Sequence, residues 1–406
     1  MAAKNAQKGE RRIAIGEWRL NHPVMRLPLL FAAVFASIHL ISHAQAPGVA
    51  PAPSAAPPAA TPAVVPPLEW HDVKTWGVEG RAWPEMERLR WFDRFPAAAQ
   101  SQVTPKVWDL SRDSAGMMVR FKTDAKSIWA HYVLRSDHLA NTNMTAIGTS
   151  GIDLYGRDDH GKLRWVGVAK PDTKEVKQAI VSGLQPGTRE YAAYLPLYNG
   201  VESLEIGVPP EAKFEGLAPR AEKPLVFYGT SITHGASASR PGMVHTAILG
   251  RHLEIPVVNL GFSGNGKMDA AVGEFLVKID AAAYIIDCLP NMGPADVRQK
   301  CQPLVKLIRA ARPETPIVLV EDRRNANSWI LPARNKLHDD NHAALRESYD
   351  ALIKEGFKKL YYVPGDDLIG DDAEGSTDGS HPNDLGFVRQ AAIFEPVLRE
   401  ALGWKP

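Results

Sequence analysis

Three features of the sequence predict an α/β fold preceded by an all-β domain. From about residue 221, short apolar runs alternate with segments of helical period, which is typical of a parallel sheet with helices on both faces. Between residues 68 and 208, short alternating runs lie between Asp, Gly, Pro and Asn turn signals, the pattern of a β-sandwich or jelly roll. The chain has 406 residues, more than one ordinary core holds, which agrees with two domains.

The first 46 residues have the features of an export signal. From Met25 there is one basic residue, then an apolar run over residues 27–41 and a small-residue exit ending at Ala46, which predicts a cleaved secretory signal peptide. Met25 is an alternative start, because the residues ahead of it are polar; a long n-region and an uncleaved signal anchor are further alternatives. The apolar run is too short for a comfortable membrane span. We therefore expect a periplasmic or extracellular protein without a stable membrane anchor.

Residues 47–67 are rich in Pro and Ala and carry no charge, so they predict an extended spacer. The predicted β-sandwich domain follows at 68–215, on runs such as GMMVRFKT (116–123), SIWAHYVL (127–134), SGIDLYGR (150–157), LRWVGVA (163–169), REYAAYLPLY (189–198) and VESLEIGV (201–208). Five of its tryptophans are Trp83, Trp91, Trp108, Trp129 and Trp165. We favour a core position for each of them, and a sugar-stacking platform is the alternative.

The predicted α/β domain covers residues 216–406. Its buried-type strands are expected at 224–228, 255–260, 282–287, 316–321 and 360–363, and its helices at 243–253, 268–279, 294–311, 339–356 and 384–402. Ligands of such sheets bind beyond the carboxyl ends of the strands. The residues that follow the strands are therefore the candidates for chemistry.

Charge and cysteine content restrict the partners. Lys and Arg total 47 against 46 for Asp and Glu, a net charge of +1, which provides no electrostatic footprint for nucleic acid or an anionic membrane. The two cysteines, Cys288 and Cys301, are either buried free thiols, which we favour, or a disulfide formed after export.

The stretch GFSGNGKM, residues 261–268, matches seven of the eight positions of a phosphate-binding loop. The mismatch is Met268, which stands where a hydroxyl would bind magnesium, and a thioether is a poor ligand for so hard a cation. The loop also follows the second strand of the unit, which leaves the Ser-rich turn after the first strand unexplained. We therefore do not predict nucleotide binding.

Three residues on separate loops predict a nucleophilic site. Ser231 follows Gly229 on a tight strand-to-helix turn, and Asp378 and His381 stand three apart in DGSH. A serine hydroxyl needs an adjacent base, and the base needs an orienting group. We expect the carboxylate to accept one ring N–H while the other ring nitrogen faces Ser231.

The anion that forms on attack needs preorganised donors. The backbone N–H groups of Ser231 and Gly264 and the side-chain amide of Asn291 are expected to supply them. The glycine-rich loop GFSGNG then approaches the oxygen of a tetrahedral carbon, and no phosphate is required to explain it.

Four blocks of the sequence resemble those of the SGNH (GDSL-type) hydrolases. They are YGTSITHG with Ser231, NLGFSGNG with Gly264, DCLPNM with Asn291, and DGSHP with Asp378 and His381. A bacterial subgroup with an N-terminal β-sandwich and the motif SRPGM (239–243) is more similar still, over residues 68–403. The resemblance implies a flavodoxin-like α/β/α domain with a five-stranded parallel sheet, ester hydrolysis by Ser, His and Asp, and no metal or cofactor.

Two departures from that pattern concern the third block and the first. LPNM replaces the broad family's G-x-N-D, which agrees with the subgroup, and His234 stands where the subgroup has Gln. His234, Arg240 and Trp329 are therefore candidate substrate contacts, with a salt-bridged loop anchor as the alternative for Arg240 and ordinary packing for Trp329. His338 and His342 have zinc-ligand spacing on a predicted helix, but without a visible third ligand we favour a solvated helix face.

These features predict an exported serine esterase whose substrate is an acylated small molecule or carbohydrate. The resemblance implies that it removes small acyl groups, with acetyl expected, from a carbohydrate or polysaccharide. An acyltransferase using the same site is one alternative. A carbohydrate-binding protein with a vestigial hydrolase domain is the other, against which the presence of every expected catalytic residue argues.

Overall fold

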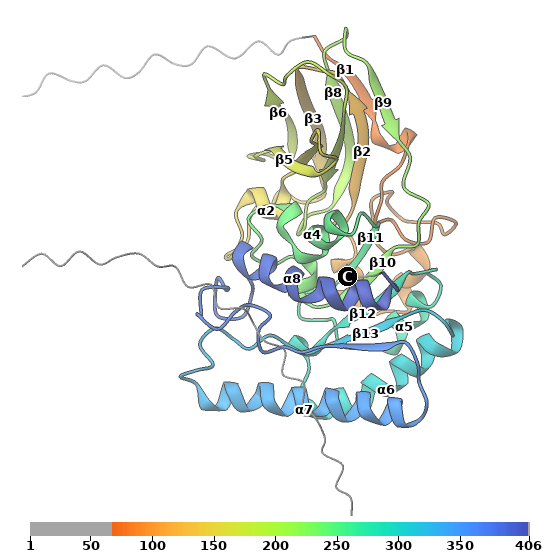
Figure 1. Ribbon diagram of the computed structural model, residues 1–406. Helices are drawn as coiled ribbons and strands as arrows, with labels where there is room; N and C mark the ends of the chain where they lie inside the picture. The colour runs from red at the N-terminus through yellow and green to blue at the C-terminus, as the bar shows by residue number, and fades with distance from the viewer. Residues whose placement is uncertain (1–66, 405–406) are drawn as a thin grey trace, which may run out of the picture. The chain divides into compact units, whose positions relative to one another are not determined.

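The computed structural model describes residues 67–404 (Figure 1). The predicted signal region and all but the last residue of the predicted spacer lie outside the described residues. Within residues 67–404, no helix combines the length and the apolarity that a membrane span needs. Both cysteines are free and buried.

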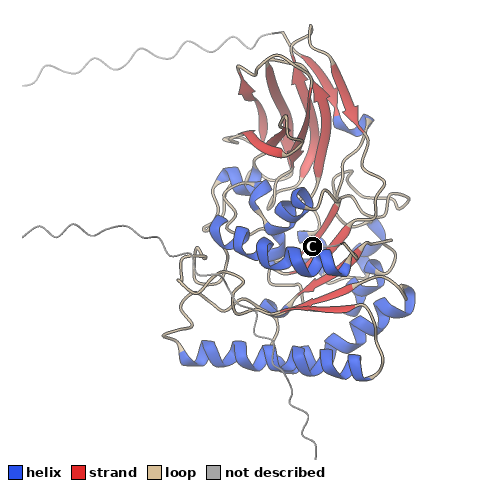
Figure 2. Ribbon diagram, viewed as in Figure 1, coloured by secondary structure: helices blue, strands red, loops and turns tan. Residues whose placement is uncertain are grey.

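Two antiparallel sheets form the predicted β-sandwich (Figure 2). One sheet pairs its strands in the order β1 (Glu69–Asp72), β8 (Val201–Val208), β3 (Ser127–Leu134) and β6 (Glu175–Ser182). The other has the order β5 (Leu163–Val168), β4 (Asp153–Arg157), β7 (Arg189–Tyr194), β2 (Met118–Thr123) and β9 (Phe214–Leu217). Alternate residues of β3 are buried, and they join both sheets in one apolar core. A sandwich, the first of the two predicted all-β architectures, is therefore confirmed.

Three strands escaped prediction: β1, β6 and β9. All three are edge strands, whose polar positions outnumber their buried ones; β6, for example, buries only Val176 and Ile180. An edge strand has one neighbour and less cover, so its apolar alternation is weak. Among the tryptophans, Trp83 is buried as favoured, whereas Trp165 is 51% exposed and donates its indole N–H to Asp153.

The C-terminal half contains the predicted five-stranded parallel sheet. Its order is β11 (Val257–Gly261), β10 (Leu225–Gly229), β12 (Ala283–Asp287), β13 (Ile317–Val320) and β14 (Leu360–Val363). Every neighbouring pair is parallel, which gives the flavodoxin-like order. The strand order reverses between β10 and β12, and ligands of open α/β sheets bind beyond the strand ends at such a point.

Helices cover both faces of this sheet (Figure 1). One layer holds α4 (His245–His252) and α8 (Asp384–Ala401), and the other holds α5 (Ala270–Leu276), α6 (Pro294–Ala311) and α7 (Pro332–Lys354). Alternate strand residues serve the two layers: Phe227 and Ile285 belong to the apolar cluster of α4 and α8, and Tyr228 and Ile286 to the cluster of α5, α6 and α7. Shorter segments are α1 (Pro105–Leu110), α2 (Ala146–Ser150), α3 (Ser231–His234) and the 3₁₀ turns η1 (Val73–Thr75), η2 (Ala97–Ser101), η3 (Pro241–Met243) and η4 (Leu289–Asn291).

Helix α7 begins at Pro332, seven residues before the predicted start at 339. Its first turns are exposed up to His338, so they carry no apolar period from which a helix is predicted. Pro332 at the first helical position is nevertheless a recognised start signal. The segment between β13 and α7 is therefore shorter than the predicted strand at 316–321 and helix at 339–356 leave between them.

The segment between β1 and β2 joins the sandwich to the α/β domain. The guanidinium of Arg94 is buried and donates to the carbonyls of Asn259 (3.0 Å) and Gly261 (2.9 Å). The ring of Phe95 stacks on that of Phe262 with centroids 5.4 Å apart. Burial lowers the pKa of Arg94 to about 10, so the side chain remains a cation at neutral pH. This contact fixes the end of β11, from which the glycine-rich loop departs.

Candidate active site

The nucleophile candidate lies at the carboxyl end of β10. Ser231 is the first residue of α3, and the side chain of Thr230 caps this short helix by accepting from the N–H of Ile232. Ser231 is buried, with an exposed fraction of 8%. Its side chain contacts His381, which lies 150 positions away in the sequence.

Ser231, His381 and Asp378 form one hydrogen-bonded chain. The Ser231 Oγ lies 2.9 Å from Nε2 of His381, and Nδ1 of His381 lies 2.7 Å from Oδ2 of Asp378. The other oxygen of Asp378 accepts the backbone N–H groups of Ser380 (3.0 Å) and His381 (2.8 Å). The structure therefore brings the three predicted residues together on the rim of one sheet, while their catalytic roles stay predictions.

The charge state of Asp378 follows from these contacts. Burial by itself raises the pKa of this carboxyl, but the hydrogen bonds from the backbone and ring of His381 and from Ser380 outweigh it, so the pKa lies below its usual value. Asp378 is thus ionised at neutral pH and fixes the proton of His381 on Nδ1. The lone pair of Nε2 is then free to accept the Ser231 proton.

The predicted oxyanion donors come from the loop after β11 and the turn after β12. Gly264 has φ 68°, and a Cβ at this residue would meet no atom within 4 Å, so the glycine is required by its backbone conformation. A Cβ at Gly266 would lie 1.9 Å from the Gly229 carbonyl, so this second glycine permits the loop to pack against the nucleophile turn. Both requirements explain the run GFSGNG without a phosphate.

Asn291, in η4, is held by the same loop. Its amide satisfies its neighbours when the oxygen accepts from the N–H groups of Asn265 (3.1 Å) and Gly266 (3.2 Å). The amide NH₂ group then remains as the donor for a substrate oxygen. Asn291 and the glycine-rich loop thus fix one another.

Asp287, which ends β12, has a structural partner. Both of its oxygens bind the guanidinium of Arg323, at 2.6 and 2.7 Å, and Oδ2 also accepts from the Thr233 hydroxyl. Asp287 is fully buried. The carboxylate that a phosphate-binding loop would need for magnesium is thus engaged in an ion pair, and Met268 is buried in the core.

We expect Arg323→Met to lower the free energy of unfolding by about 3–5 kcal/mol, because it leaves the carboxylate of Asp287 buried without its cation. Urea denaturation measures this change. Arg298→Gln is the control, since Arg298 pairs with Glu347 on the surface, where solvent screens the ion pair and its loss should change stability little. Equal losses for the two variants would contradict the assignment.

The three candidate substrate contacts lie in different surroundings. His234 is fully buried, its ring stacked on Tyr198 with centroids 4.1 Å apart, and burial followed by the charge of Arg94 holds its pKa well below the usual value. It offers no surface to a substrate in this structure. Trp329, by contrast, is 78% exposed. Its loop reaches the catalytic turn, because the N–H of Ala326 donates to the carbonyl of Gly379 (2.8 Å).

Arg240 anchors its loop to the sandwich, the alternative given for it above. Its guanidinium binds the buried carboxylate of Asp153 (2.8 Å) and the hydroxyl of Tyr155. Asp153 also accepts the N–H of Gly242 (2.8 Å). The GIDLY segment of β4 therefore holds the SRPGM segment that follows the nucleophile turn.

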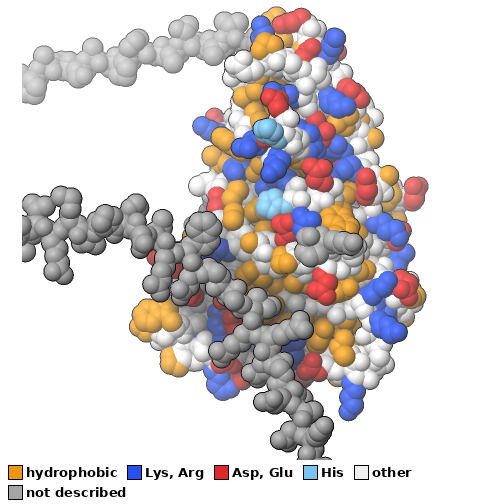
Figure 3. Space-filling view, viewed as in Figure 1, with side chains coloured by type: hydrophobic (Ala, Val, Ile, Leu, Met, Phe, Trp, Pro, Cys, Tyr) orange, Lys and Arg blue, Asp and Glu red, His pale blue; other side chains and the backbone are white. Residues whose placement is uncertain are grey.

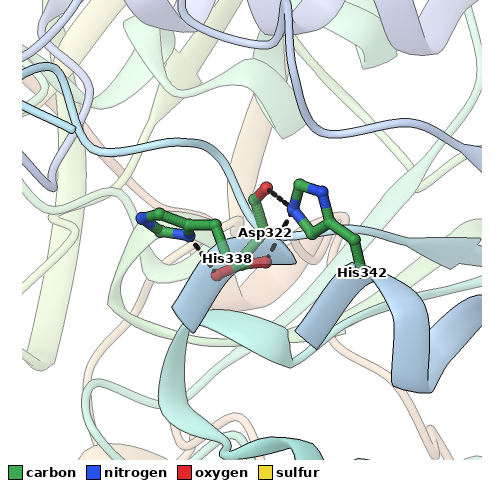
Figure 4. A group of neighbouring side chains, drawn as sticks. All are labelled: Asp322, His338 and His342. Carbon is green, nitrogen blue, oxygen red and sulfur yellow. Dashed lines mark hydrogen bonds and ion pairs between the residues drawn. The ribbon is translucent and has the colours of Figure 1, made fainter. Parts of the chain in front are cut away.

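The prediction of a solvated face for His338 and His342 was wrong. Both are buried, at 4% and 8% exposure, and lie against Asp322 (Figure 4). Asp322 follows β13, so the rule that examines strand ends would have found it. Sequence reasoning missed it because Asp322 is 16 residues from His338 and only the fold places it beneath the helix.

Two family models match the chain. The GDSL-like lipase/acylhydrolase family matches residues 222–399, and the N-terminal domain of SGNH-hydrolase-type esterases, named GxDLY, matches residues 68–214. A comparison with curated proteins found no match.

Solved structures resemble the chain over most of its length. A Bacteroides ovatus protein described as a GDSL-like lipase is 34% identical, with 84% of this chain and 99% of that chain covered and a TM-score of 0.79. A salicylyl-acyltransferase from a tetracycline biosynthetic pathway is 20% identical, with coverage of 80% and 94% and a TM-score of 0.63. A family two carbohydrate esterase from Cellvibrio japonicus is 13% identical, with coverage of 83% and 99% and a TM-score of 0.54. The last two likenesses show the fold alone.

Proposed function

Because the chain belongs to the GDSL/SGNH hydrolase family, with an N-terminal GxDLY domain, we propose that it is a serine esterase that removes acetyl groups from a carbohydrate. The observation that carries this proposal is the hydrogen-bonded chain from Ser231 through His381 to Asp378. Such a chain turns a weakly nucleophilic hydroxyl into an acyl acceptor. Its completeness argues against a vestigial hydrolase domain.

In the proposed reaction the Ser231 Oγ attacks the ester carbonyl carbon while Nε2 of His381 takes the hydroxyl proton. The tetrahedral intermediate collapses, the C–O bond to the sugar breaks, and His381 returns the proton to the leaving alkoxide. Water, deprotonated by His381, then attacks the acyl-enzyme. Collapse of the second intermediate releases acetate and restores Ser231. Asp378 stays ionised throughout and stabilises the imidazolium.

The negative oxygen of each intermediate would be met by the backbone N–H groups of Ser231 and Gly264 and by the amide of Asn291. These groups are fixed before substrate arrives, since Gly264 belongs to a hydrogen-bonded loop and Asn291 is held by that loop. Preorganised donors stabilise the charge without reorganisation during the reaction.

The surroundings of the site favour a neutral, bulky alcohol component. The side chains of His381 and Asp378 are 26% and 40% exposed, so an ester carried on a large molecule can reach the triad. Positive and negative side chains are interspersed on the face shown in Figure 3, in agreement with the net charge of +1. We include Trp329 as a proposed stacking surface for a sugar ring, and Arg240 as a proposed contact of lesser weight.

Acyl transfer to an alcohol is the second candidate, since an acyl-enzyme can react with either acceptor. The fold is shared with an acyltransferase as well as with a carbohydrate esterase, so the fold does not separate the two reactions. Product analysis with an added alcohol acceptor separates them. We further propose, from the signal-like residues 1–46 alone, that the reaction takes place outside the cytoplasm.

We expect the purified protein to release acetate from acetylated sugars or polysaccharides. It should also prefer p-nitrophenyl acetate to esters with acyl chains of eight or more carbons. Released acetate and p-nitrophenol are the measured products. Trp329→Ala should raise KM for the best acetylated sugar with little effect on ethyl acetate, because ethyl acetate has no ring that could stack on the indole.

The panel distinguishes the levels of the proposal. Hydrolysis of p-nitrophenyl acetate without release of acetate from any sugar would support an esterase but contradict a carbohydrate substrate. Faster hydrolysis of the long-chain esters would remove the acetyl preference. An inactive wild-type protein would contradict the esterase itself.

A further inference from the structure

The group of Asp322, His338 and His342 has a ligand geometry that a metal ion could use. One atom from each residue lies within 4.8 Å of the others, and histidines four apart on a helix are common zinc ligands. Figure 4 shows the imidazole rings of His338 and His342 on α7 directed at Asp322, which follows β13. The group belongs to neither the triad nor the oxyanion donors, so its role needs an explanation.

The protons of the two rings argue against a metal. The backbone N–H of Asn325 donates to Nε2 of His338 (3.1 Å), so this nitrogen carries no proton. Nδ1 of His338 must then carry it, and it donates to Oδ2 of Asp322 (2.7 Å). A metal on Nδ1 would require an imidazolate. Nε2 of His342 lies 2.8 Å from the Asp322 carbonyl oxygen and 2.9 Å from its Oδ1, which makes this nitrogen a donor as well.

The same hydrogen bonds lead from His338 to the catalytic turn. Nε2 of His338 accepts from Asn325, and the next residue, Ala326, donates its N–H to the carbonyl of Gly379 (2.8 Å). Gly379 follows Asp378 directly, and a Cβ built at Gly379 would lie 3.5 Å from the Asn327 side chain. The loop formed by residues 321–331 is therefore in contact with the turn that presents Asp378 and His381.

We propose that His338 is a positioning residue for the catalytic turn, acting through the N–H of Asn325, and that the Asp322, His338 and His342 group holds no metal. Asp322 and His342 orient the ring of His338, and the ring fixes the loop at Asn325. This inference rests on the proposed esterase function for its kinetic consequence, but not for its structural one.

Two arginines that precede Asn325 also anchor the loop. Arg323 is bound to Asp287 and Gln390, and Arg324 to Asp366 and Asn335. Residues 326–331 follow, and they include the exposed Trp329. Loss of the Asn325 contact should therefore free the part of the loop that faces the catalytic turn while the two arginines remain bound.

Three substitutions separate the two hydrogen bonds of His338. His338→Gln places an amide oxygen near the position of Nε2, so it keeps an acceptor for the Asn325 N–H. His338→Asn places an NH₂ group near the position of Nδ1, so it keeps the donor to Asp322 and loses the acceptor. His338→Ala loses both. His252→Ala is the matched control, since His252 is an exposed histidine paired with Glu395.

We expect His338→Ala and His338→Asn to lower kcat for p-nitrophenyl acetate by about ten- to a hundredfold per reactive serine, with KM little changed. His338→Gln should recover most of that loss. Titration with a fluorophosphonate counts the reactive serines. Hydrogen exchange followed by mass spectrometry should show faster exchange of peptides spanning 376–382 in the Ala and Asn variants, and near wild-type exchange in the Gln and His252→Ala proteins.

Three outcomes would overturn the proposal. One is unchanged exchange at 376–382 in His338→Ala, which is decisive whether or not the protein hydrolyses esters. A second is an active protein in which the Ala and Asn variants lose thermal stability but keep kcat per reactive serine. The third is close to one zinc or other divalent ion per wild-type chain by elemental analysis, lost in His338→Ala. An inactive wild-type protein with the expected exchange pattern would contradict the esterase function and leave the structural role of His338 supported.

Discussion

Ser231→Ala is expected to lower kcat for p-nitrophenyl acetate by about 10⁶-fold, to the level left by binding and the oxyanion donors. The reason is that methyl in place of hydroxymethyl removes the Oγ atom, which lies 2.9 Å from Nε2 of His381 and would attack the ester. His381→Ala should lose a similar factor. The double variant should lose no more than either single one, because the two side chains act as a unit.

The control for this prediction is Ser348→Ala. Ser348 is also buried, and its hydroxyl donates to the Ala344 carbonyl within α7, so the same chemical change is made away from the site. It should alter stability and leave kcat nearly unchanged. If Ser231→Ala retained a tenth or more of the wild-type rate, hydrolysis would come from another site and the assignment of Ser231 would fail.

Asn291→Ala is expected to lower kcat by about 100- to 1000-fold, or roughly 3–4 kcal/mol, with KM little changed. The amide NH₂ of Asn291 is directed by two hydrogen bonds from Asn265 and Gly266 to its oxygen. It would bind the substrate oxygen most strongly when that oxygen becomes an anion. Steady-state kinetics of the purified variant measure the effect.

Asn341→Ala is the matched test of a merely structural role. The Asn341 amide donates to the Met292 carbonyl, next to Asn291, so its loss disturbs the same turn without removing an oxyanion donor. Asn341→Ala should therefore lower the free energy of unfolding and have only a small effect on kcat. Similar kcat losses in the two variants would mean that Asn291 supports the turn and does not stabilise the anion.

The central elements of the fold could be predicted because burial on both faces leaves a strong signal. The predicted strand at 282–287 corresponds to β12, in which every residue is buried, and the predicted strand at 224–228 corresponds to β10. The start of α7 was missed because the residues of its first turns face solvent and show no apolar period, although Pro332 is a start signal. Three edge strands of the sandwich, β1, β6 and β9, were missed because their apolar alternation is weak.

The site divides in a similar way. Ser231, Gly264, Asn291, Asp378 and His381 could be named because each follows a strand or lies in the loop before the last helix, and parallel strands end on one side of a sheet. Arg94 and Tyr198 could not, because their partners are backbone carbonyls and a stacked ring. Asp322 follows β13 and could have been named by the same rule, but its contact with the histidines of α7 could not. No sequence spacing records such contacts.

The amino-acid sequence by itself determined the candidate residues for the chemistry and the strands of the parallel sheet, since residue type and apolar period are local properties of the chain. The tertiary structure alone decided how those residues are supported. It buried His234, engaged Arg240 with Asp153, and turned a histidine pair that looked solvated into a closed cluster around Asp322. These outcomes depend on which distant segments pack together, and a buried polar group takes the partner that the packing supplies.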